Sequence, residues 1–440
     1  MQLVPLALDR EPLDVLASLA AVGGACLVEV PDPLRPMTLL GCAPVDELRV
    51  AASEPDPIAA IVRFVDSVPQ ADAALPFPLG GGVIACLAYE LGAATVPGIA
   101  RRDPGTPLAV LRRYDPMLAY DRARGTWALL ASAAGVRAPW LDRLAAPAPV
   151  FTAPLARGEL SAALDRDAYR AAVDRIHAYL RAGDVYQVNL TQPFTVPLDG
   201  PAWALYQRLA RRNPAPFGAY LDLGDAQVVA NSPELWLRRR GRRVETRPIK
   251  GTRPRSADPA RDAALASELA RDAKERAEHV MIVDLERNDL GRVCRVGSVT
   301  VESHARVESH PTVHHLVSVV SGELADGAGL RDLLVAAFPG GSITGAPKRR
   351  AMQIIAEIEP WPRGVYTGAI GLIDPRGDVE LGLPIRTGVV QHGRLRYHAG
   401  GGIVVDSVAS RELDECWLKT AAIRAALGED TSALERCSSG

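Results

Sequence analysis

The sequence predicts an α+β fold built on an antiparallel β-sheet. Two features carry this prediction: strand-like runs come as hairpin-like groups joined by short turns, and helical stretches are grouped together along the chain. A doubly wound parallel sheet is disfavoured because it requires helices and strands that alternate strictly. The chain has 440 residues, which is enough for two or three domains or for one large composite fold.

Residues 1–145 are predicted to be a strand-and-turn region. Their short apolar runs end in turn residues, as where residues 25–30 run into Pro31 and Pro33, and one helix is predicted over 56–67. Residues 146–164 are rich in Ala and Pro, so we predict a linker there, followed by a second region over 165–427. Residues 428–440 are predicted to be a C-terminal tail.

The second region begins with a helix. Tyr169, Val173, Ile176 and Leu180 follow helical spacing, and Gly183 comes just after the predicted end. Further helices are predicted over 258–287 with a break, 330–338, 348–357 and 410–427, and strands over 185–192, 228–237, 244–249, 293–302 and 366–405.

The composition excludes several classes of function. A formal net charge of −2 gives no basic surface for a nucleic acid or an anionic membrane. No apolar run reaches the length of a membrane span, and the N-terminus lacks the basic segment of a signal peptide. The cysteines form no C-x-x-C pair, which favours free thiols in a reducing cytoplasm over disulfides or a zinc site. They are Cys26, Cys42, Cys86, Cys294, Cys416 and Cys437.

The basic stretch over 247–255 places Lys250 between an apolar residue and a Gly-Thr turn, with three arginines close by. A lysine that is partly desolvated among like charges loses its proton more readily and can act as a nucleophile or base. A solvated basic loop is the plain alternative. Upstream, Ser232-Pro233-Glu234 ends a predicted strand, so Glu234 and Lys250 form an acid and nucleophile pair in outline.

Two pairs of carboxylates lie on separate predicted helices. Glu275 and Glu278 share one helical face, and Glu412, Glu415 and Lys419 share another. Carboxylates that converge from two helices suit Mg²⁺, which takes a few carboxylates together with water and substrate oxygens. The alternative is that each pair forms salt bridges at the surface.

Two glycine-rich stretches are predicted to expose backbone N–H groups. Residues 338–348 resemble a phosphate-binding loop, but Ala346 stands where that loop needs its lysine, so a carboxylate ligand is favoured over a nucleotide. Residues 399–404 are predicted to form a second turn, with Tyr366 and Arg386 upstream as anion partners.

Four histidines fall within twelve residues and match no zinc spacing, so at most one is expected to act as an acid, a base or an orienting group. They are His304, His310, His314 and His315.

A series of motifs in fixed order carries a resemblance to a known family. The motifs are residues 183–190 (Gly-Asp-Val-Tyr-Gln-Val-Asn-Leu), 232–234 (Ser-Pro-Glu), 248–254 (Pro-Ile-Lys-Gly-Thr-Arg-Pro), 281–285 (Met-Ile-Val-Asp-Leu), 287–290 (Arg-Asn-Asp-Leu), 315–318 (His-Leu-Val-Ser), the turn over 340–348, 364–368 (Gly-Val-Tyr-Thr-Gly), and 399–407 with Glu412 and Glu415. Together they resemble the chorismate-utilising enzymes, which include component I of anthranilate and aminodeoxychorismate synthases. The resemblance implies a sandwich of large antiparallel sheets with flanking helices, to which both parts of the chain contribute.

The resemblance also implies the roles of the site residues. Mg²⁺ would lie near Glu278 and Glu415, with Glu275 and Glu412 close by. The ring carboxylate of chorismate would meet the metal, helped by Lys419 and the turn that carries Thr344. The substrate would further contact Gly251, Thr252, Tyr366, Arg386 and the backbone of Gly400, Gly401 and Gly402, with His315 near the ring.

Two positions select a branch within this family. Members that add water resemble one another in carrying a basic lysine where this chain has Gln187, so that branch is disfavoured. Anthranilate synthases usually have Ala at the position of Lys250, whereas a lysine there is typical of aminodeoxychorismate synthases. The resemblance then implies that neutral Lys250 attacks C2 of chorismate while Glu234 protonates the leaving C4 hydroxyl, after which ammonia adds at C4.

The chain shows no glutamine-hydrolysing motif, so ammonia is expected from a separate glutaminase subunit, component II. Three alternatives compete with this prediction. They are anthranilate synthase component I, a non-catalytic chorismate-binding subunit, and an ATP-dependent amide ligase. Lys250 opposes the first, and Glu234, Lys250, Glu278 and Glu415 together oppose the second. The third needs a nucleotide cradle that the sequence does not supply.

Overall fold

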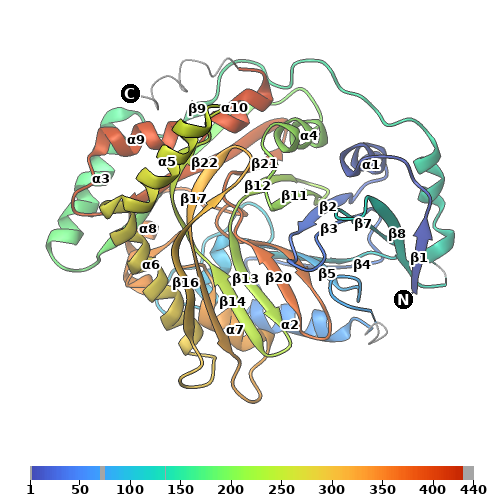
Figure 1. The fold of residues 1–440 in the computed structure, drawn as a ribbon, viewed down its shortest axis with the longest axis horizontal. Coiled ribbons are helices and arrows are strands. Elements are labelled where there is room, and N and C mark those ends of the chain that lie inside the picture. The colour runs from blue at the N-terminus through green and yellow to red at the C-terminus, as the bar shows by residue number, and fades with distance from the viewer. Residues whose placement is uncertain (1, 70–74, 134, 430–440) are drawn as a thin grey trace.

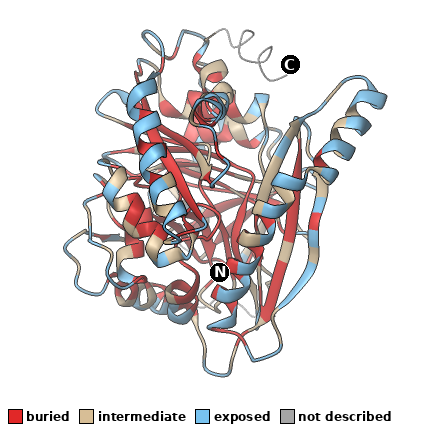
Figure 2. Ribbon diagram, turned by 90° about the vertical axis from the view of Figure 1, so that its left-hand side faces the viewer, coloured by how far each residue is buried: buried red, intermediate tan, exposed pale blue. Residues whose placement is uncertain are grey.

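A computed structural model describes residues 2–69, 75–133 and 135–429. Two antiparallel sheets pack face to face, and helices cover their outer sides (Figure 1). The buried residues concentrate in the strands, while the outer faces of the helices are exposed (Figure 2). The α+β fold with packed antiparallel sheets is therefore confirmed.

The first sheet has 12 strands within the described residues. In spatial order these are β1 (Gln2–Leu6), β8 (Thr126–Ala131), β7 (Met117–Asp121), β3 (Met37–Gly41), β2 (Cys26–Val30), β11 (Phe217–Asp222), β12 (Gln227–Ser232), β21 (Thr387–Gln391), β22 (Arg394–Ile403), β10 (Gln187–Pro197) and β18 (Gly345–Ala346), with β9 (Ser161–Ala162) paired to β10.

The second sheet has 10 strands within the same residues. In spatial order these are β15 (Ile249–Pro254), β17 (Val313–Glu323), β14 (Arg243–Arg247), β13 (Leu235–Arg240), β20 (Val379–Gly382), β19 (Ala369–Ile373), β5 (Val83–Leu87), β6 (Ala109–Arg113) and β4 (Asp46–Val50), with β16 (Thr300–Ser309) paired to β17.

Helices cover the sheets from outside. The α-helices are α1 (Pro12–Leu19), α2 (Pro57–Ser67), α3 (Arg166–Arg181), α4 (Ala202–Arg212), α5 (Pro259–Arg271), α6 (Ala273–Gly291), α7 (Leu330–Ala337), α8 (Lys348–Ile358), α9 (Ala409–Leu418) and α10 (Ala421–Leu427). Short 3₁₀ helices are η1 (Tyr89–Ala94), η2 (Gly135–Arg137) and η3 (Pro139–Ala145).

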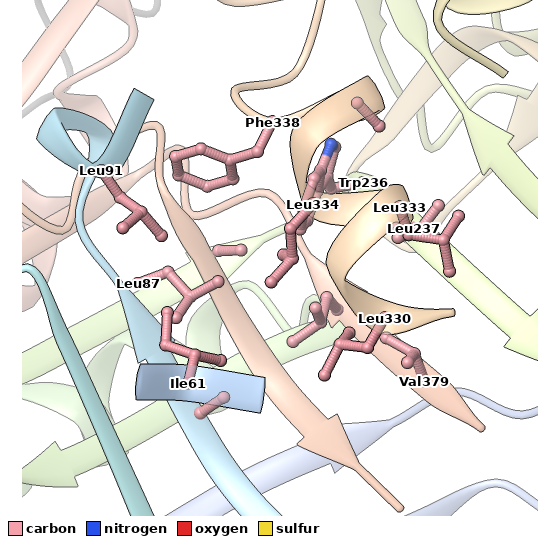
Figure 3. Close-up of a cluster of buried hydrophobic side chains, with 14 of the residues drawn as sticks. Ile61, Leu87, Leu91, Trp236, Leu237, Leu330, Leu333, Leu334, Phe338 and Val379 are labelled. Atoms are coloured by element: carbon pink, nitrogen blue, oxygen red, sulfur yellow. The ribbon is translucent and has the colours of Figure 1, made fainter. Parts of the chain in front are cut away.

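The core lies in layers on both sides of each sheet. Between the sheets, Val28 and Leu39 of the first meet Ile84 and Leu372 of the second. Outside the second sheet, α7 and α2 bury an apolar cluster against its strands (Figure 3). Its labelled members include Ile61, Leu87, Trp236, Leu237, Leu330, Leu333, Leu334, Phe338 and Val379. Because these apolar side chains are buried from water, their packing holds the second sheet against α2 and α7.

Strands from both parts of the chain occur in both sheets. β2 pairs with β11 in the first sheet, and β5 pairs with β19 in the second. Residues 1–145 and 165–427 therefore share one pair of sheets.

Three strand predictions differ from the structure. The strand predicted over 228–237 is two strands, since the chain leaves the first sheet after Ser232 and enters the second at Leu235. Pro233 cannot donate to a sheet ladder, which explains the break, and Pro248 likewise divides 244–249 between β14 and β15. Within 293–302, only the last residues belong to a strand, because β16 begins at Thr300.

Two further predictions are corrected at the C-terminal end. The glycines at 400–402 form no turn but lie inside β22, paired with residues 189–191 of β10. The helix predicted over 410–427 is broken into α9 and α10 at Lys419 and Thr420. The break predicted within 258–287 is confirmed at Asp272, which caps α6 through its side chain.

The described residues contain five of the cysteines, all buried free thiols. Cys437 and the predicted tail from residue 430 onward lie outside the described residues. None of the helices in the described ranges combines the length and the apolar character that a membrane crossing requires.

Candidate active site

Glu234 is buried at the point where the chain passes from one sheet to the other. Its Oε1 accepts a 2.7 Å hydrogen bond from the Ser342 hydroxyl. Burial raises the pKa of Glu234 to about 7, the charge of Glu286 adds to this rise, and the Ser342 hydrogen bond and the charge of Lys250 oppose it. A carboxyl group with such a pKa carries a proton in about half of the molecules near neutral pH and can donate it to a leaving group.

Lys250 lies on β15 at a bulge. Lys250 pairs with Leu316 of β17, whereas Thr252 pairs with the very next partner, His315, so Gly251 is the extra residue. Gly251 has φ of +66°, a conformation that favours glycine. The bulge therefore lies inside the predicted Pro-Ile-Lys-Gly-Thr motif.

The bulge also brings β15 close to helix α6. A Cβ atom at Gly251 would lie 2.7 Å from Leu269 Cδ1 and 3.3 Å from Glu275 Oε2. The charge of Lys250 lowers the pKa values of Glu234 and Glu275, which shows that both carboxyl groups lie within its electrostatic reach. The predicted acid and the predicted nucleophile therefore lie near one another, and their roles stay predictions.

Each of the three arginines around Lys250 forms an ion pair with an acidic side chain. Arg247 pairs with Glu308, Arg253 with Glu268 and Asp272, and Arg255 with Asp262. The charge of Lys250 itself lowers the pKa values of Glu234, Glu275 and Glu415. The sequence suggested unpaired like charges around Lys250, but each of the three arginines has an acidic partner.

The four predicted metal-binding carboxylates face one another from α6 and α9. Burial raises the pKa of Glu275, and the charges of Glu278 and Glu415 raise it further. Burial and the charge of Glu415 likewise raise the pKa of Glu412. Lys274 Nζ lies 3.8 Å from Glu278 Oε1 and 4.0 Å from Glu412 Oε1, so it bridges the two helices.

Lys419 connects this cluster to β22. Its Nζ lies 2.7 Å from Glu415 Oε1 and donates a 2.8 Å hydrogen bond to the Gly400 carbonyl. The charge of Lys419 is the main reason that the pKa of Glu415 is lowered. A Cβ atom at Gly401 would approach Lys419 Nζ at 3.4 Å and Glu412 Oε2 at 3.7 Å, so glycine leaves this side of the strand open.

The donor set fits Mg²⁺ in its chemistry. All four side chains offer the hard oxygen donors that Mg²⁺ prefers, and neighbouring carboxylates help to raise the pKa values of Glu275 and Glu412. Among the described residues, no three acidic, histidine or cysteine side chains are already closed around one point. Mg²⁺ can bind through one or two carboxylates when substrate and water complete its shell, and the magnesium site stays a prediction.

His315 is buried beside the bulge. Its Nδ1 donates to the Gly251 carbonyl at 3.3 Å and lies 3.0 Å from Thr252 Oγ1, whereas Nε2 has no partner among the described residues. Burial, together with the positive charge of Arg386, lowers the pKa of His315 to about 3. The ring is therefore neutral at physiological pH and can accept or orient a hydrogen bond through Nε2.

Arg386 and Tyr366 lie on adjacent loops. Thr367 donates a 3.0 Å backbone hydrogen bond to Pro384, two residues before Arg386, and the Tyr366 ring stacks on His398 at 5.2 Å. Burial lowers the pKa of Arg386, and within the described ranges its guanidinium forms no ion pair. An arginine in this state is suited to bind a carboxylate ligand.

Several polar groups of the glycine-rich turn over 340–346 form hydrogen bonds within the protein. Gly341 N–H donates a 2.9 Å hydrogen bond to Glu286, and the Thr344 hydroxyl donates at 3.1 Å to the carbonyls of Gly340 and Gly341. Asn189 of β10 donates to the Thr344 carbonyl at 2.9 Å. The turn is thus held rigidly, and the role of Thr344 toward a substrate remains a prediction.

Gln187 is completely buried at the start of β10. Both polar atoms of its carboxamide lack partners within the described residues. A Cβ atom at Gly402 would lie 2.7 Å from Gln187 Nε2, so the missing side chain of this glycine makes room for the amide. The amide can donate and accept hydrogen bonds, but it cannot deprotonate water.

Sequence reasoning missed three residues next to the site. Ser342 lies inside the predicted turn, but only the fold shows that it contacts Glu234. Arg363 and Glu359 form a buried ion pair against β10 and the turn, and neither belongs to a motif that the sequence singled out. A buried charge is visible only when the fold is known, because the sequence around Arg363 does not show that it is enclosed.

Comparisons with known proteins point to one family. Residues 24–425 match the family model described as chorismate binding enzyme. The chain is 42% identical to "Anthranilate synthase component 1" of Thermus thermophilus, over 84% of this chain and 82% of that protein. It is also 42% identical to "Aminodeoxychorismate synthase component 1" of Salmonella typhimurium, over 80% of this chain and 77% of that protein. The solved structure of anthranilate synthase component I from Streptococcus pneumoniae TIGR4 matches with a TM-score of 0.78 and 31% identity, over 89% of this chain and 92% of that one.

Proposed function

The chain belongs to the chorismate binding enzyme family, and from this premise we propose that it aminates chorismate at C4 to give 4-amino-4-deoxychorismate. The observation that carries the proposal is the shared site of Lys250 and Glu234, in which a nucleophile lies within the field of a carboxyl group whose pKa is about 7. Overall identity does not select this reaction, because relatives of both names match at 42%.

In the proposed first step, the neutral amine of Lys250 forms a bond to C2 of chorismate. Both ring double bonds shift, from C1=C2 to C1=C6 and from C5=C6 to C4=C5, the C4–O bond breaks, and Glu234 gives its proton to the leaving oxygen, which departs as water. The result is a secondary ammonium that links Lys250 to the ring, together with an ionised Glu234.

In the second step, ammonia forms a bond to C4 and both double bonds shift back to C5=C6 and C1=C2. The C2–N bond breaks, so Lys250 leaves as a neutral amine, and the new ammonium at C4 returns one proton to Glu234. The sum of both steps is chorismate plus ammonia giving 4-amino-4-deoxychorismate plus water. Two displacements at one lysine place the new amine on the carbon that lost the hydroxyl group.

The other site residues bind the dianionic substrate. Arg386 and Tyr366 would hold the enolpyruvyl carboxylate, and Lys419 would turn from Glu415 toward the ring carboxylate. Glu278 and Glu415, with Glu275 and Glu412 beside them, would hold Mg²⁺. When bound, this ion would supply positive charge for the ring carboxylate.

We further propose that a separate glutaminase subunit supplies the ammonia, which agrees with the "component 1" in the names of relatives. The five buried free thiols support a reducing, cytoplasmic setting.

The test is product analysis by mass spectrometry. The chain is incubated with chorismate, Mg²⁺ and ammonium, with aminodeoxychorismate lyase added to one half. We expect 4-aminobenzoate only in the half with lyase, and its loss in Lys250→Ala. Anthranilate formed without the lyase would instead identify the second candidate, anthranilate synthase component I, which the Thermus thermophilus relative favours.

A further inference from the structure

Arg363 is a completely enclosed cation that touches two walls of the candidate site. Its side chain is 1% exposed. Nη1 donates a 2.8 Å hydrogen bond to the Ile343 carbonyl in the glycine-rich turn, and Nη2 donates a 2.7 Å hydrogen bond to the Asn189 carbonyl in β10. One planar group therefore fixes the spacing between the turn and the strand.

Glu359 holds this guanidinium in place. Its two oxygens accept 2.8 Å hydrogen bonds from Arg363 Nε and Nη2. Oε1 also accepts from the backbone N–H of Thr191 at 2.9 Å and from the Thr191 hydroxyl at 3.1 Å. The pair is thus bidentate and bonded a second time to β10, which restricts how far Arg363 can shift.

A third contact reaches the N-terminal part of the chain. The backbone N–H groups of Arg363 and Gly364 donate to the carboxylate of Glu90 in η1, at 2.7 and 3.1 Å. The Tyr89 ring lies under the guanidinium at 4.7 Å. These contacts also place the segment that carries Tyr366, two residues after Gly364.

The turn that Arg363 holds is the turn that carries Ser342. Ile343 is the residue next to Ser342, and Ser342 donates directly to Glu234. On the other side, Asn189 lies two residues from Gln187, whose buried amide faces Gly402. A shift of Arg363 therefore moves the groups on both sides of the substrate space.

We propose that Arg363, locked by Glu359, is a positioning residue that sets the distance between the glycine-rich turn and β10, and thereby aligns Glu234 with the substrate. The inference rests on the proposed function in so far as Glu234 is the proton donor. Arg363 itself touches neither the reacting atoms nor the site interior, so it acts through Ile343, Ser342 and β10.

The test compares Arg363→Lys with a matched control, Arg238→Lys. Arg238 forms a similar bidentate buried pair with Glu380, at 2.8 and 2.7 Å, and none of its bonds reaches a residue of the site. Lysine keeps the charge of either residue but cannot reproduce the planar fork of donors. Both variants are expected to lower the melting temperature by similar amounts.

Only Arg363→Lys is expected to affect catalysis. We expect kcat/KM for chorismate at saturating ammonium to fall on the order of 10²-fold, as for a misplacement of about 1 Å. The alkaline limb of the kcat profile should also move to higher pH, since a displaced Ser342 no longer lowers the pKa of Glu234. In Arg238→Lys, both quantities should match the wild type. Equal loss of melting temperature with unchanged kcat/KM and pH profile would show that Arg363 is only structural and would overturn the inference.

A second pair of variants makes smaller changes, so that the test still works if Arg363→Lys does not fold. Thr191→Val removes one hydrogen bond to Glu359, and Thr38→Val removes the 2.8 Å hydrogen bond from a buried threonine to Glu29, away from the site. A several-fold loss of kcat/KM in Thr191→Val alone is expected, and equal behaviour of the two variants would contradict the proposal.

Chorismate affinity separates this inference from the proposed function. Chorismate is titrated into the Mg²⁺-loaded chain and its affinity is measured by calorimetry. Binding should be weaker for Arg363→Lys than for Arg238→Lys, whichever product forms. If the wild type makes no 4-amino-4-deoxychorismate, the proposed function fails. If affinity, kcat/KM and the pH profile are all equal in both variants, the positioning role fails.

Discussion

The Ser342 hydroxyl donates a 2.7 Å hydrogen bond to the carboxyl group of Glu234, a residue 108 positions earlier in the chain. This contact joins the glycine-rich turn to the candidate proton donor. It stabilises the ionised carboxylate and so opposes the rise in pKa that burial causes. The turn thus holds the pKa of Glu234 below the value that burial alone would give.

Ser342→Ala should therefore shift the pH dependence of the reaction. Loss of the hydrogen bond raises the pKa of Glu234 above about 7, so the acid stays protonated to higher pH. The alkaline limb of the kcat profile, measured with saturating chorismate and ammonium, should move upward. Ser298→Ala, which removes a serine hydroxyl bonded to backbone carbonyls at the surface, is the control. An unshifted limb in Ser342→Ala would mean that Glu234 is not the titrating acid.

Glu234→Gln should lower kcat and raise the free energy of unfolding. We expect kcat to fall about 10²- to 10⁴-fold, the usual contribution of a general acid. The folded pKa of about 7 lies above the value of 4.5 for a free glutamate, so Glu234 costs stability progressively as pH rises from 4.5 to 7. Above pH 7 the variant should gain roughly 1–3 kcal/mol in free energy of unfolding.

Urea unfolding at pH 5 and pH 8 measures this effect. The gain should be small at pH 5 and largest at pH 8, while the exposed variant Asp284→Asn should show no such difference. A gain of equal size at both pH values would indicate altered packing in place of a buried charge.

Arg386→Lys should weaken chorismate binding. A lysine cannot form the bidentate contact with a carboxylate, so KM for chorismate should rise by one to two orders of magnitude, which is about 1.4–2.8 kcal/mol. Arg243→Lys, a change at an exposed arginine that pairs with Glu302, should leave KM unchanged. Steady-state kinetics at saturating ammonium decides between these outcomes, and an unchanged KM in Arg386→Lys would place the substrate carboxylate elsewhere.

Lys419→Met should tighten Mg²⁺ binding before chorismate arrives. Lys419 lies 2.7 Å from Glu415 and competes with a cation for this carboxylate. Calorimetric titration with Mg²⁺ alone should show higher affinity for the variant, whereas KM for chorismate should rise because the ring carboxylate loses a partner. Lys274→Met removes a more distant lysine and should give a smaller gain. Lower Mg²⁺ affinity in Lys419→Met would exclude Glu415 as a ligand.

His315 should contribute no ionisation to the working pH range. Burial and Arg386 lower its pKa to about 3, so the ring is neutral throughout. His315→Asn retains a hydrogen-bonding group, and its kcat profile should therefore keep the shape of the wild-type profile even where kcat is lower. Loss of a limb near pH 6 to 7 in this variant would show that His315 titrates.

Much of the fold follows from local sequence signals. The helix predicted over 56–67 begins at Pro57 with Asp56 as its N-cap, and the break predicted within 258–287 lies at Asp272. The grouping of strands also gave the right fold class. Strand ends were harder, because at Pro233 and Pro248 the apolar pattern continues while the chain changes its partner strand.

The chemistry of the site was predictable only in part. Residue types and spacing identify Glu234, Lys250 and the carboxylate pairs, since each needs a particular functional group at a particular place. Spacing does not show what surrounds a side chain. The arginines near Lys250 are neutralised by distant acids, and Arg363 is enclosed by residues from three separate segments.

The sharing of both sheets by the two ends of the chain has a consequence for synthesis. β5 is made early, yet its partner β19 begins only at Ala369, and β2 likewise waits for β11, which begins at Phe217. A growing chain must keep these apolar strand edges unpaired until most of its length has emerged. Folding is then dominated by distant contacts and is expected to be slow, so demand for chaperones should be greatest during translation. Fragments that stop before residue 369 leave β5 without this partner and should aggregate.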